Sequence, residues 1–347
     1  MGRKAKTRKA QTQSHRETKK VQYRVRNWSQ YNASLVERGS LEVWIEEDVL
    51  ANWKPQTSGP RRRGGQVQYS AGAIECMLTL GAVLSLPLRQ TEGFGRSVMR
   101  RLGVDTKVPD YTTLCKRKKD LKVTLSTRKR KGPLHILVDS TGLKVYGEGE
   151  WKVRKHGYSK RRTWRKLHLS VNEDTQEIEI AVLTEVGKDD AGAAHKPGIV
   201  TRSPCPLGTG GQMLQDIPDP VERVSGDGAY DQRKFYKACA TCEIADVVVP
   251  PRRNAHIWQH GNSAKPPLVR DQHVRRIRRI GRERWKQETG YHRRSLVETT
   301  VFRFKTIFGG SLMARTFDRQ IVEALIKCKA LNSMTQLGLP DSYPVSA

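Results

Sequence analysis

The spacing of apolar residues along the second half of the chain predicts a sheet with helices around it. Five short apolar or alternating runs have the length and composition of strands: residues 134–138, 163–171, 177–184, 221–224 and 244–249. The first three follow one another closely enough to form an antiparallel meander, and a helix is expected over residues 232–242 between the last two. This order predicts an α/β fold, in which a mixed sheet is flanked by helices.

The segments between these strands carry weaker patterns. Residues 189–203 are expected to form a helix that Gly192 and Pro197 weaken. The sequence Gly-Thr-Gly-Gly at 208–211 is expected to break the chain. Residues 152–166 hold eight Lys or Arg and no acid, which predicts either a basic hairpin over a nucleic-acid groove or a hairpin that is merely solvated.

In the first half of the chain the pattern is helical. Apolar residues return at helical intervals over residues 27–53, and three helices are expected over residues 70–122, with Ser70 and Asp110 as the caps of the first and third. The third helix is short and cationic and follows a tight turn, as the recognition helix of a helix-turn-helix does. Its candidate DNA contacts are Thr112, Thr113, Lys116 and Arg117. Any small helical domain with a basic face would, however, show the same pattern.

The most distinctive stretch is residues 291–305, which contain no Gly or Pro and carry apolar residues at helical intervals. At about 100° per residue, four polar side chains fall on one stripe beside the apolar face: they are Tyr291, Arg294, Glu298 and Lys305. One acid therefore lies among two cations and a phenol. A solvated, salt-bridged helix face would also explain the stripe, since Arg294 and Glu298 form an ordinary (i, i+4) pair.

The net charge of the chain limits the kinds of partner that it is expected to bind. The 347 residues include 64 Lys and Arg against 35 Asp and Glu, a formal net charge of +29. Such an excess repels itself in the compact state and is usually offset by a polyanion, so DNA is the expected partner. Residues 1–26, with ten Lys or Arg and one acid, are expected to form a disordered basic arm that binds phosphates.

Composition also bears on the location of the protein. The most apolar run, residues 71–88, contains Glu75 and Pro87, so no membrane span is expected. Six cysteines spread over the chain suit reduced thiols better than a disulfide framework. A soluble, intracellular protein is therefore expected.

Three acids occupy prominent positions in the predicted elements. Asp139 follows the first strand in Val-Asp-Ser-Thr, Asp227 follows the fourth in Gly-Asp-Gly-Ala-Tyr-Asp, and Glu298 is the acid of the stripe. With Tyr-x2-Arg-x3-Glu-x6-Lys over residues 291–305, these motifs resemble the RNase H-like catalytic core of DDE transposases from bacterial insertion sequences. The stretch Pro-Asp-Tyr-Thr-Thr-Leu-Cys-Lys-Arg is similar to a region of the insertion-sequence-five family. The interval from Asp227 to Glu298 is short for relatives that carry a large β-rich insertion.

The resemblance implies a metal-dependent enzyme that acts on DNA. Asp139, Asp227 and Glu298 would hold two Mg²⁺ ions, for which Mn²⁺ can substitute, with Asp139 bridging both. The donors to phosphates beside the cut would be Tyr291, Arg294 and Lys305. The expected DNA partners are the terminal inverted repeats of the element and a target. A homodimer that pairs the two ends is expected, in the cytoplasm of a prokaryote and on nucleoid DNA.

Two further sets of residues are weaker candidates. Trp258 or Trp285 is a candidate to stack on a base pulled from the helix near the cut, although both would also serve as core tryptophans. Cysteines and histidines with the spacing of a zinc finger are Cys239, Cys242, His256 and His260. The strand expected at residues 244–249 lies between them and argues against zinc.

The predicted elements divide the chain into regions of different role. In order they are a basic arm (1–26), a helical DNA-binding region (27–130), a catalytic core with a basic insertion at about 251–280 (131–310), and a helical C-terminal region (311–347). The apolar face of a helix at 318–337 indicates packing or dimer contacts. Two alternatives stay open: a non-enzymatic helix-turn-helix regulator leaves the three acids without a purpose, and an RNase H-like metal-dependent nuclease would need no end recognition.

Overall fold

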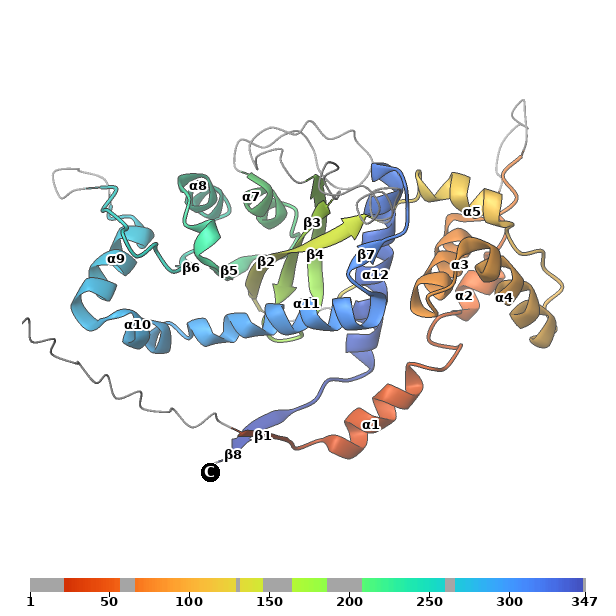
Figure 1. Cartoon of the computed structure of the whole chain (residues 1–347), viewed down its shortest axis with the longest axis horizontal. Helices are drawn as coiled ribbons and strands as arrows, with labels where there is room; N and C mark the ends of the chain where they lie inside the picture. The colour runs from red at the N-terminus through yellow and green to blue at the C-terminus, as the bar shows by residue number, and fades with distance from the viewer. Residues whose placement is uncertain are drawn as a thin grey trace, which may run out of the picture.

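A sheet lies in the middle of an elongated molecule, with a group of helices at each end (Figure 1). The computed structural model describes residues 22–56, 66–128, 132–145, 164–185, 208–259 and 266–345. Most of the predicted basic hairpin and all of the predicted helix at 189–203 lie outside these residues.

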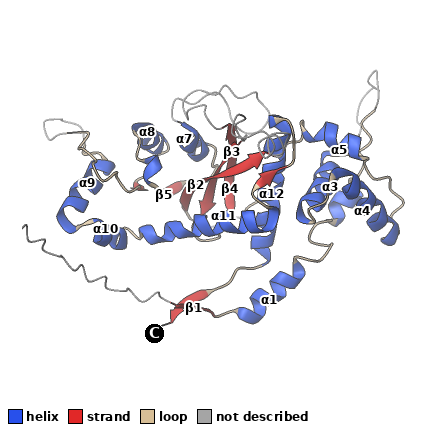
Figure 2. Ribbon diagram, in the orientation of Figure 1, coloured by secondary structure: helices blue, strands red, loops and turns tan. Residues whose placement is uncertain are grey.

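The sheet has the strand order β4-β3-β2-β5-β6 and mixes antiparallel with parallel pairs. Its strands are β2 (Leu134–Val145), β3 (Trp164–Asn172), β4 (Ile178–Glu185), β5 (Val221–Gly226) and β6 (Asp246–Val248), with β7 (Ser311–Leu312) beside the end of β2. The pairs β2–β3 and β3–β4 are antiparallel, whereas β2–β5 and β5–β6 are parallel. The predicted meander and the mixed sheet flanked by helices are confirmed (Figure 2).

Strand β2 is longer than the apolar run predicted. The prediction ended the strand at Val138, but β2 continues to Val145 and therefore has Asp139 in its interior. The register gives the reason: the parallel neighbour β5 stops opposite Val138, while the antiparallel pairing with β3 continues to Lys144. One side of β2 thus loses its hydrogen-bonding neighbour at Asp139, and the other side keeps it.

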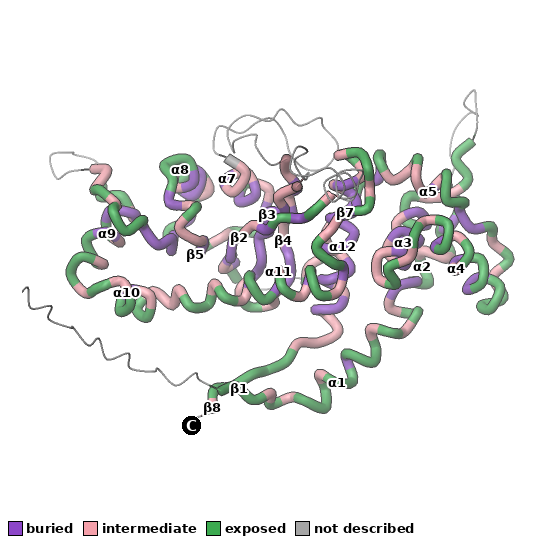
Figure 3. Tube along the Cα trace, viewed as in Figure 1, coloured by how far each residue is buried: buried purple, intermediate pink, exposed green. Residues whose placement is uncertain are grey.

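Helices cover both faces of this sheet: α7 (Gly208–Gln215) and α8 (Arg233–Thr241) on one, and α11 (Ser295–Phe308) and α12 (Phe317–Leu337) on the other. Side chains of β2 alternate between these faces. Ile136 and Val138 join the apolar cluster of α7 and α8, while Leu137 and Leu143 join the cluster of α11 and α12. The middle of the sheet is accordingly buried (Figure 3). Asp139 shares the alternation of Leu137, so its side chain lies on the α11 face.

Helix α7 begins at Gly208, where the sequence predicted a break, and that prediction was wrong. A Cβ on Gly210 would lie 2.8 Å from the ring of Tyr230, which belongs to the short 3-10 helix η1 (Gly228–Tyr230). The absence of a side chain lets α7 approach this ring closely. The glycines lower the helix propensity of this segment, but Gly210 allows the helix to pack closely against Tyr230.

The N-terminal helices are α1 (Trp28–Glu37), α2 (Glu47–Ala51), α3 (Ala71–Val83), α4 (Leu88–Arg101) and α5 (Tyr111–Lys118). Both predicted caps are confirmed: Ser70 accepts a hydrogen bond from the amide of Ala73 at 3.1 Å, and Asp110 accepts one from Thr113 at 2.7 Å. Among the described helices, none alone is long and apolar enough to cross a membrane, although α3 and α4 meet that measure together as a pair bent by 109°.

The N-terminal helices pack directly on α12. Lys118 forms an ion pair with Glu323 at 3.3 Å, and Arg319 donates a hydrogen bond to the carbonyl of Cys115 at 2.9 Å. One apolar cluster contains Ile74 of α3 together with residues of the sheet, α11 and α12. The change of pattern near residue 131 therefore does not separate two cores, and the apolar surface of α12 is used for packing.

The two ends of the chain meet in a small ribbon of β1 (Gln22–Val25) and β8 (Ser342–Val345), which pair antiparallel. The expected disordered arm included residues 22–25, so the expectation was wrong for them. Their pairing partner lies at the other end of the sequence, where no local pattern could reveal it. Residues 1–21 of the arm lie outside the described part of the chain.

The segment expected to be a basic insertion, at about residues 251–280, ends in helix α9 (Val269–Ile280), and a second helix, α10 (Arg282–Glu288), follows it. Gly281, with φ of 85°, separates them. A 3-10 turn, η2 (Tyr291–Arg294), then precedes α11, so the helix predicted from residue 291 starts at Ser295. Gly290 in the left-handed region, with φ of 61°, makes the tight entry to this turn.

Candidate active site

Two of the predicted acids lie at the end of the parallel strand pair. Val138 of β2 pairs with Gly226 of β5, and Asp139 and Asp227 are the next residues of the two strands. Asp227 leaves the strand there and caps η1, where its Oδ1 accepts a hydrogen bond from the amide of Ala229 at 2.9 Å. The oxygen Oδ1 of Asp139 accepts one from the Ser140 amide at 2.8 Å. Each carboxylate is therefore oriented by a backbone amide.

The third acid comes from helix α11. The buried face of α11 consists of Val297, Thr300, Phe304 and Phe308. Glu298 follows Val297 and turns to the adjacent face, where its side chain is 55% exposed. The sequence folds this way because the apolar residues return every three or four positions and leave the acid just outside the packed face.

Arg294 joins two of the three acids. Its Nη1 lies 3.5 Å from Oδ2 of Asp139, and its Nη2 contacts Oε1 of Glu298. The guanidinium carbon also lies 5.8 Å from the ring centroid of Tyr291. The side chain of Arg294 is only 15% exposed. Three members of the predicted stripe, Tyr291, Arg294 and Glu298, are thus in contact, with the arginine inside the group of acids rather than beside it.

The acids influence one another electrostatically. Burial raises the pKa of Asp139, and the nearby charges of Asp227 and Glu298 raise it further. The hydrogen bond from Ser140 and the charge of Arg294 act in the opposite direction. Three carboxylates from three different elements therefore share one electrostatic environment, and Arg294 is the cation that partly compensates their repulsion.

The same carboxylates also affect the pKa values of Arg294 and Tyr291. Burial alone would lower the pKa of Arg294, but Tyr291 and the three carboxylates outweigh it and raise this pKa. Burial raises the pKa of Tyr291, with a smaller contribution from Asp227. The guanidinium therefore stays charged and the phenol keeps its proton, so both can donate hydrogen bonds to an anion.

The chemistry of these donors fits a hard divalent cation. Carboxylate oxygens from separate elements are the ligands that Mg²⁺ takes while it keeps several waters. Among the described residues, no three acidic, histidine or cysteine side chains are close enough together to hold a metal ion as they stand. The charge of Arg294 lies between Asp139 and Glu298 instead. The oxygens suited to a metal ion are thus engaged by an internal cation.

The remaining members of the predicted site differ in accessibility. Lys305 is exposed and lies two turns along α11 from Glu298, on the same side of the helix. Trp285 is fully buried, and its Nε1 donates to Nδ1 of His273 at 3.1 Å. The burial leaves no ring face of Trp285 open to a base, so the structure favours the core interpretation for this tryptophan. Tyr291 lies against it, with ring centroids 6.0 Å apart.

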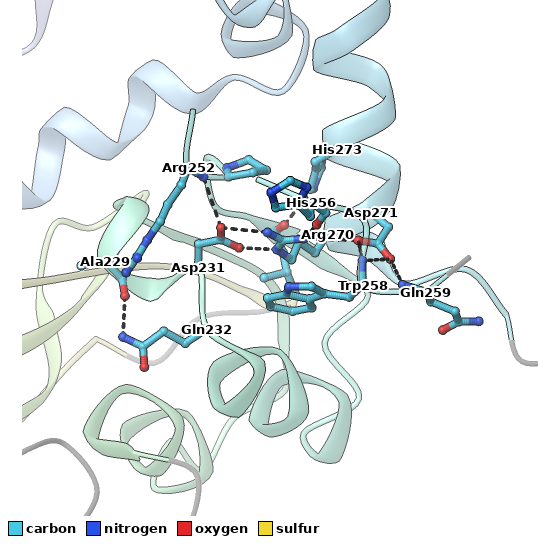
Figure 4. A network of polar contacts seen from close by, with 12 residues as sticks. Ala229, Asp231, Gln232, Arg252, His256, Trp258, Gln259, Arg270, Asp271 and His273 are labelled. Atoms are coloured by element: carbon cyan, nitrogen blue, oxygen red, sulfur yellow. Dashed lines mark hydrogen bonds and ion pairs between the residues drawn. The ribbon is translucent and has the colours of Figure 1, made fainter. Parts of the chain in front are cut away.

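Trp258 is partly exposed, but three side chains contact its ring. The guanidinium carbons of Arg270 and Arg233 lie 3.7 Å and 5.1 Å from its ring centroid, and the ring of Tyr236 meets it edge-on at 5.7 Å. Figure 4 shows the guanidinium of Arg270 beside Asp231 and over the indole. A base that stacks on Trp258 would therefore have to displace one of these side chains.

This cluster contains residues that the sequence did not single out correctly. Arg270 lies in the expected basic insertion at about residues 251–280, but it is 3% exposed and bonds Asp231 through Nε at 2.6 Å and Nη2 at 3.3 Å. Asp271 accepts the amides of Trp258 and Gln259. Arg270 was misassigned because its sequence neighbours are cationic, whereas its buried partner lies 39 residues away.

The four candidates on α5 fall into two groups. Thr112 and Lys116 are exposed. Thr113 takes part in the Asp110 cap, and Arg117 donates to the carbonyl of Tyr69 at 3.1 Å. Thr112 belongs to the same cap, because its Oγ1 donates to Oδ1 of Asp110 at 2.6 Å. Lys116 is therefore available to a partner, while the other three side chains also have a structural role.

The cysteine pair is embedded in helix α8. Cys239 is buried there, and burial raises the pKa of its thiol well above the usual value. Strand β6 lies between Cys242 and His256 in the chain, as the sequence predicted, and His260 lies outside the described residues. Cys239 thus serves the packing of α8 against the sheet.

Two family models match the chain, and both carry the description transposase DDE domain. One covers residues 130–333, which contain the sheet, the three acids and most of α12, and the other covers residues 36–148. No solved structure matches the chain.

Proposed function

The chain belongs to the family of transposase DDE domains and is therefore a DDE transposase that acts on DNA, and we propose that it recognises and joins the ends of an insertion sequence of the insertion-sequence-five family. In this proposal it binds the terminal inverted repeats of the element. It then cuts the DNA there and transfers the ends to a target. The family implies dependence on a divalent metal, and we assign Mg²⁺ to that role, with Mn²⁺ as a substitute.

One observation carries the proposal. Asp139 and Asp227 are consecutive to the last paired residues of two parallel strands, and Arg294 links Asp139 to Glu298 on α11. Three carboxylates far apart in sequence therefore meet on one face of the sheet. A DNA-binding regulator would have no use for this convergence, because its partner is a polyanion that acids repel.

Backbone amides orient two of the three acids. The Ser140 amide fixes one oxygen of Asp139 and leaves Oδ2 on the side of Arg294, and the Ala229 amide fixes one oxygen of Asp227 in the same manner. Glu298 supplies the third carboxylate from α11. Two bound Mg²⁺ ions would supply the activation of the attacking oxygen and the stabilisation of the leaving oxygen.

The cations of the signature have a separate role in this proposal. Arg294, Lys305 and Tyr291 donate to the phosphates beside the cut, which orients the scissile bond towards the acids. Trp258, which is partly exposed, is the remaining candidate for a stacked base near the cut, and such a base would have to displace Arg233 from the ring. These residues position DNA, and the carboxylates hold the metal ions.

Recognition of the ends is assigned to the helical region at residues 27–130, which we propose to act as a helix-turn-helix with α5 as its recognition helix. The packing of α5 against both α3 and α4 and the exposure of Thr112 and Lys116 support this assignment. Pairing of two ends requires two active sites, so a homodimer is proposed for the complex with DNA. The protein would then reside on nucleoid DNA.

Substitution of the acids tests the proposal. Asp139→Asn and Glu298→Gln keep the shape of each side chain but remove a negative ligand, so Mg²⁺-dependent cleavage should fall by about three or more orders of magnitude. Binding of the ends should persist, because the many Lys and Arg residues supply it. A labelled end fragment, resolved on a denaturing gel beside a binding assay, measures both.

Glu288→Gln provides the matched control. Glu288 also pairs with an arginine, Arg276 at 2.9 Å, but lies on α10 outside the group of acids. This variant should cleave like the wild type. Near wild-type cleavage by either Asp139→Asn or Glu298→Gln would remove that acid from the site.

A further inference from the structure

The position of Arg294 is unusual for a residue that is meant to hold phosphate. In the described part of the chain its polar partners are Asp139, Glu298 and Tyr291. All three belong to the candidate site itself. The arginine is thus tied to the oxygens that a metal ion would use, and these contacts do not join it to the backbone of a neighbouring element.

The contacts with the acids are specific to one oxygen of each carboxylate. On Asp139 the oxygen Oδ1 is taken by the Ser140 amide, so Oδ2 is the atom that faces Arg294. On Glu298 the contact is with Oε1. A divalent cation and a guanidinium both seek these negative oxygens, and close cations repel each other. The metal ion and the guanidinium therefore compete for Oδ2 of Asp139 and Oε1 of Glu298.

We propose that Arg294 is a displaceable internal counter-ion, which holds the three acids together and is exchanged for the divalent cation when the cation binds. The inference rests on the proposed function, because it takes the three acids as metal ligands. In the metal-free chain Arg294 offsets the repulsion among Asp139, Asp227 and Glu298. After the exchange its five N–H donors are released for the DNA phosphate.

The exchange makes the release of Arg294 for phosphate binding depend on prior binding of the metal ion. A change of side-chain rotamer is enough to release Arg294, because Glu298 is its (i, i+4) neighbour and no bond to another element's backbone has to break. The cation therefore binds more weakly than the three acids alone would allow. In return, the phosphate donor becomes available only when the metal is present.

Metal binding to the full chain without DNA tests the exchange. Mn²⁺ binding is monitored by the decrease of the free-ion signal in electron paramagnetic resonance. Arg294→Gln should bind Mn²⁺ roughly tenfold more tightly than the wild type, which is within the usual range of coupling between competing ligands. Arg294→Lys keeps the charge without the forked donor and should give an intermediate affinity. Mn²⁺ should raise the Tm of Arg294→Gln more than that of the wild type.

Arg293→Gln is the matched control, because Arg293 is adjacent in sequence but pairs with Glu173 at 2.8 Å. Its Mn²⁺ affinity should equal that of the wild type. Equal or weaker Mn²⁺ binding by a folded Arg294→Gln variant would overturn the exchange. Asp139→Asn separates the two hypotheses: if it binds Mn²⁺ as the wild type does, the metal site and the proposed function fail, whatever Arg294 does.

Discussion

Two clusters of arginine and carboxylate side chains differ in how exposed their acids are and in which other groups bind those acids. In the first, Arg270 is buried between Asp231 and Asp271, and it also bonds the carbonyl of His256 at 2.8 Å. In the second, Arg294 lies among Asp139, Asp227 and Glu298. The residue types are the same, so composition alone does not distinguish the clusters.

The difference lies in what else satisfies the carboxylates. Asp271 accepts two backbone amides, from Trp258 and Gln259, and the side chains of Asp231 and Arg270 are 1% and 4% exposed. That cluster is closed and fixes the segment before α9 on the fold. In the Arg294 cluster Glu298 is more than half exposed. An open group of like charges with one compensating cation can accept a ligand, whereas a closed one resists any change.

The largest expected effect comes from two aspartates four residues apart, one in each cluster. Asp227→Asn should lower Mg²⁺-dependent cleavage by about three orders of magnitude, because it removes a proposed metal ligand, and should change the free energy of unfolding by less than about 1 kcal/mol. Asp231→Asn should do the reverse and destabilise the fold by about 3 kcal/mol, because it removes the closer of the two carboxylates that pair with the buried Arg270 and leaves only the Asp271 contact at 3.3 Å.

Urea unfolding and the cleavage assay, both at low temperature, measure the two effects on each variant. In Asp227→Asn the side-chain amide oxygen still accepts the hydrogen bond from the Ala229 amide, so the η1 cap is retained. The comparison breaks down if Asp231→Asn is as stable as the wild type, or if Asp227→Asn unfolds more easily than Asp231→Asn does.

A smaller effect is expected on helix α5, where exposed and engaged side chains stand side by side. Lys116→Ala should weaken binding of the element's ends and reduce the slope of log affinity against log salt by about one, as loss of one phosphate contact does. Thr112→Ala should reduce the preference for the end sequence. Arg117→Ala should instead cost about 1 kcal/mol of stability, because it removes the bond to the Tyr69 carbonyl.

Fluorescence anisotropy with an end fragment and with a scrambled fragment, at several salt concentrations, measures these changes. Lys54→Ala serves as the control for a lysine outside α5. Unchanged end binding by both Lys116→Ala and Thr112→Ala would show that α5 is not the recognition helix.

The smallest expected effect is a dependence of stability on pH at His273, which lies on α9 with Arg270. His273 contacts the carbonyl of Val247 through Nε2 at 2.9 Å and takes the Trp285 N–H at Nδ1, which requires a neutral ring. Burial lowers the pKa of His273 from 6.5, so the unfolded chain takes up the proton first as pH falls. Stability from this group is fully present above pH 6.5 and is lost as pH falls from there towards the folded-state pKa.

Urea unfolding at several pH values shows this dependence as a decline of at most about 1.4 kcal/mol per pH unit. His273→Gln keeps a donor for the Val247 carbonyl and should flatten the decline. An equally steep decline in His273→Gln would assign it to other groups.

Several features could be predicted from local sequence because local rules decide them. The caps Ser70 and Asp110, the strands of the meander and the helix at 317–337 follow from side-chain chemistry and periodicity within a few residues. The stripe of Arg294 and Glu298 follows from the helical repeat in the same manner. The predicted break at Gly208 failed for the converse reason, since the ring of Tyr230 that fits against Gly210 is distant in sequence.

By itself, the sequence determined which residues have chemistry to offer and on which kind of element each lies: two aspartates in or directly after strands and a glutamate on a helix among cations. Only the tertiary structure decided which of them meet. It brought Asp139 and Asp227 together through the parallel register of β2 and β5, and it inserted Arg294 among the acids but buried Arg270 behind Trp258. The reason is physical: periodicity is a property of neighbouring residues, whereas burial and pairing of charges depend on contacts that only the folded chain creates.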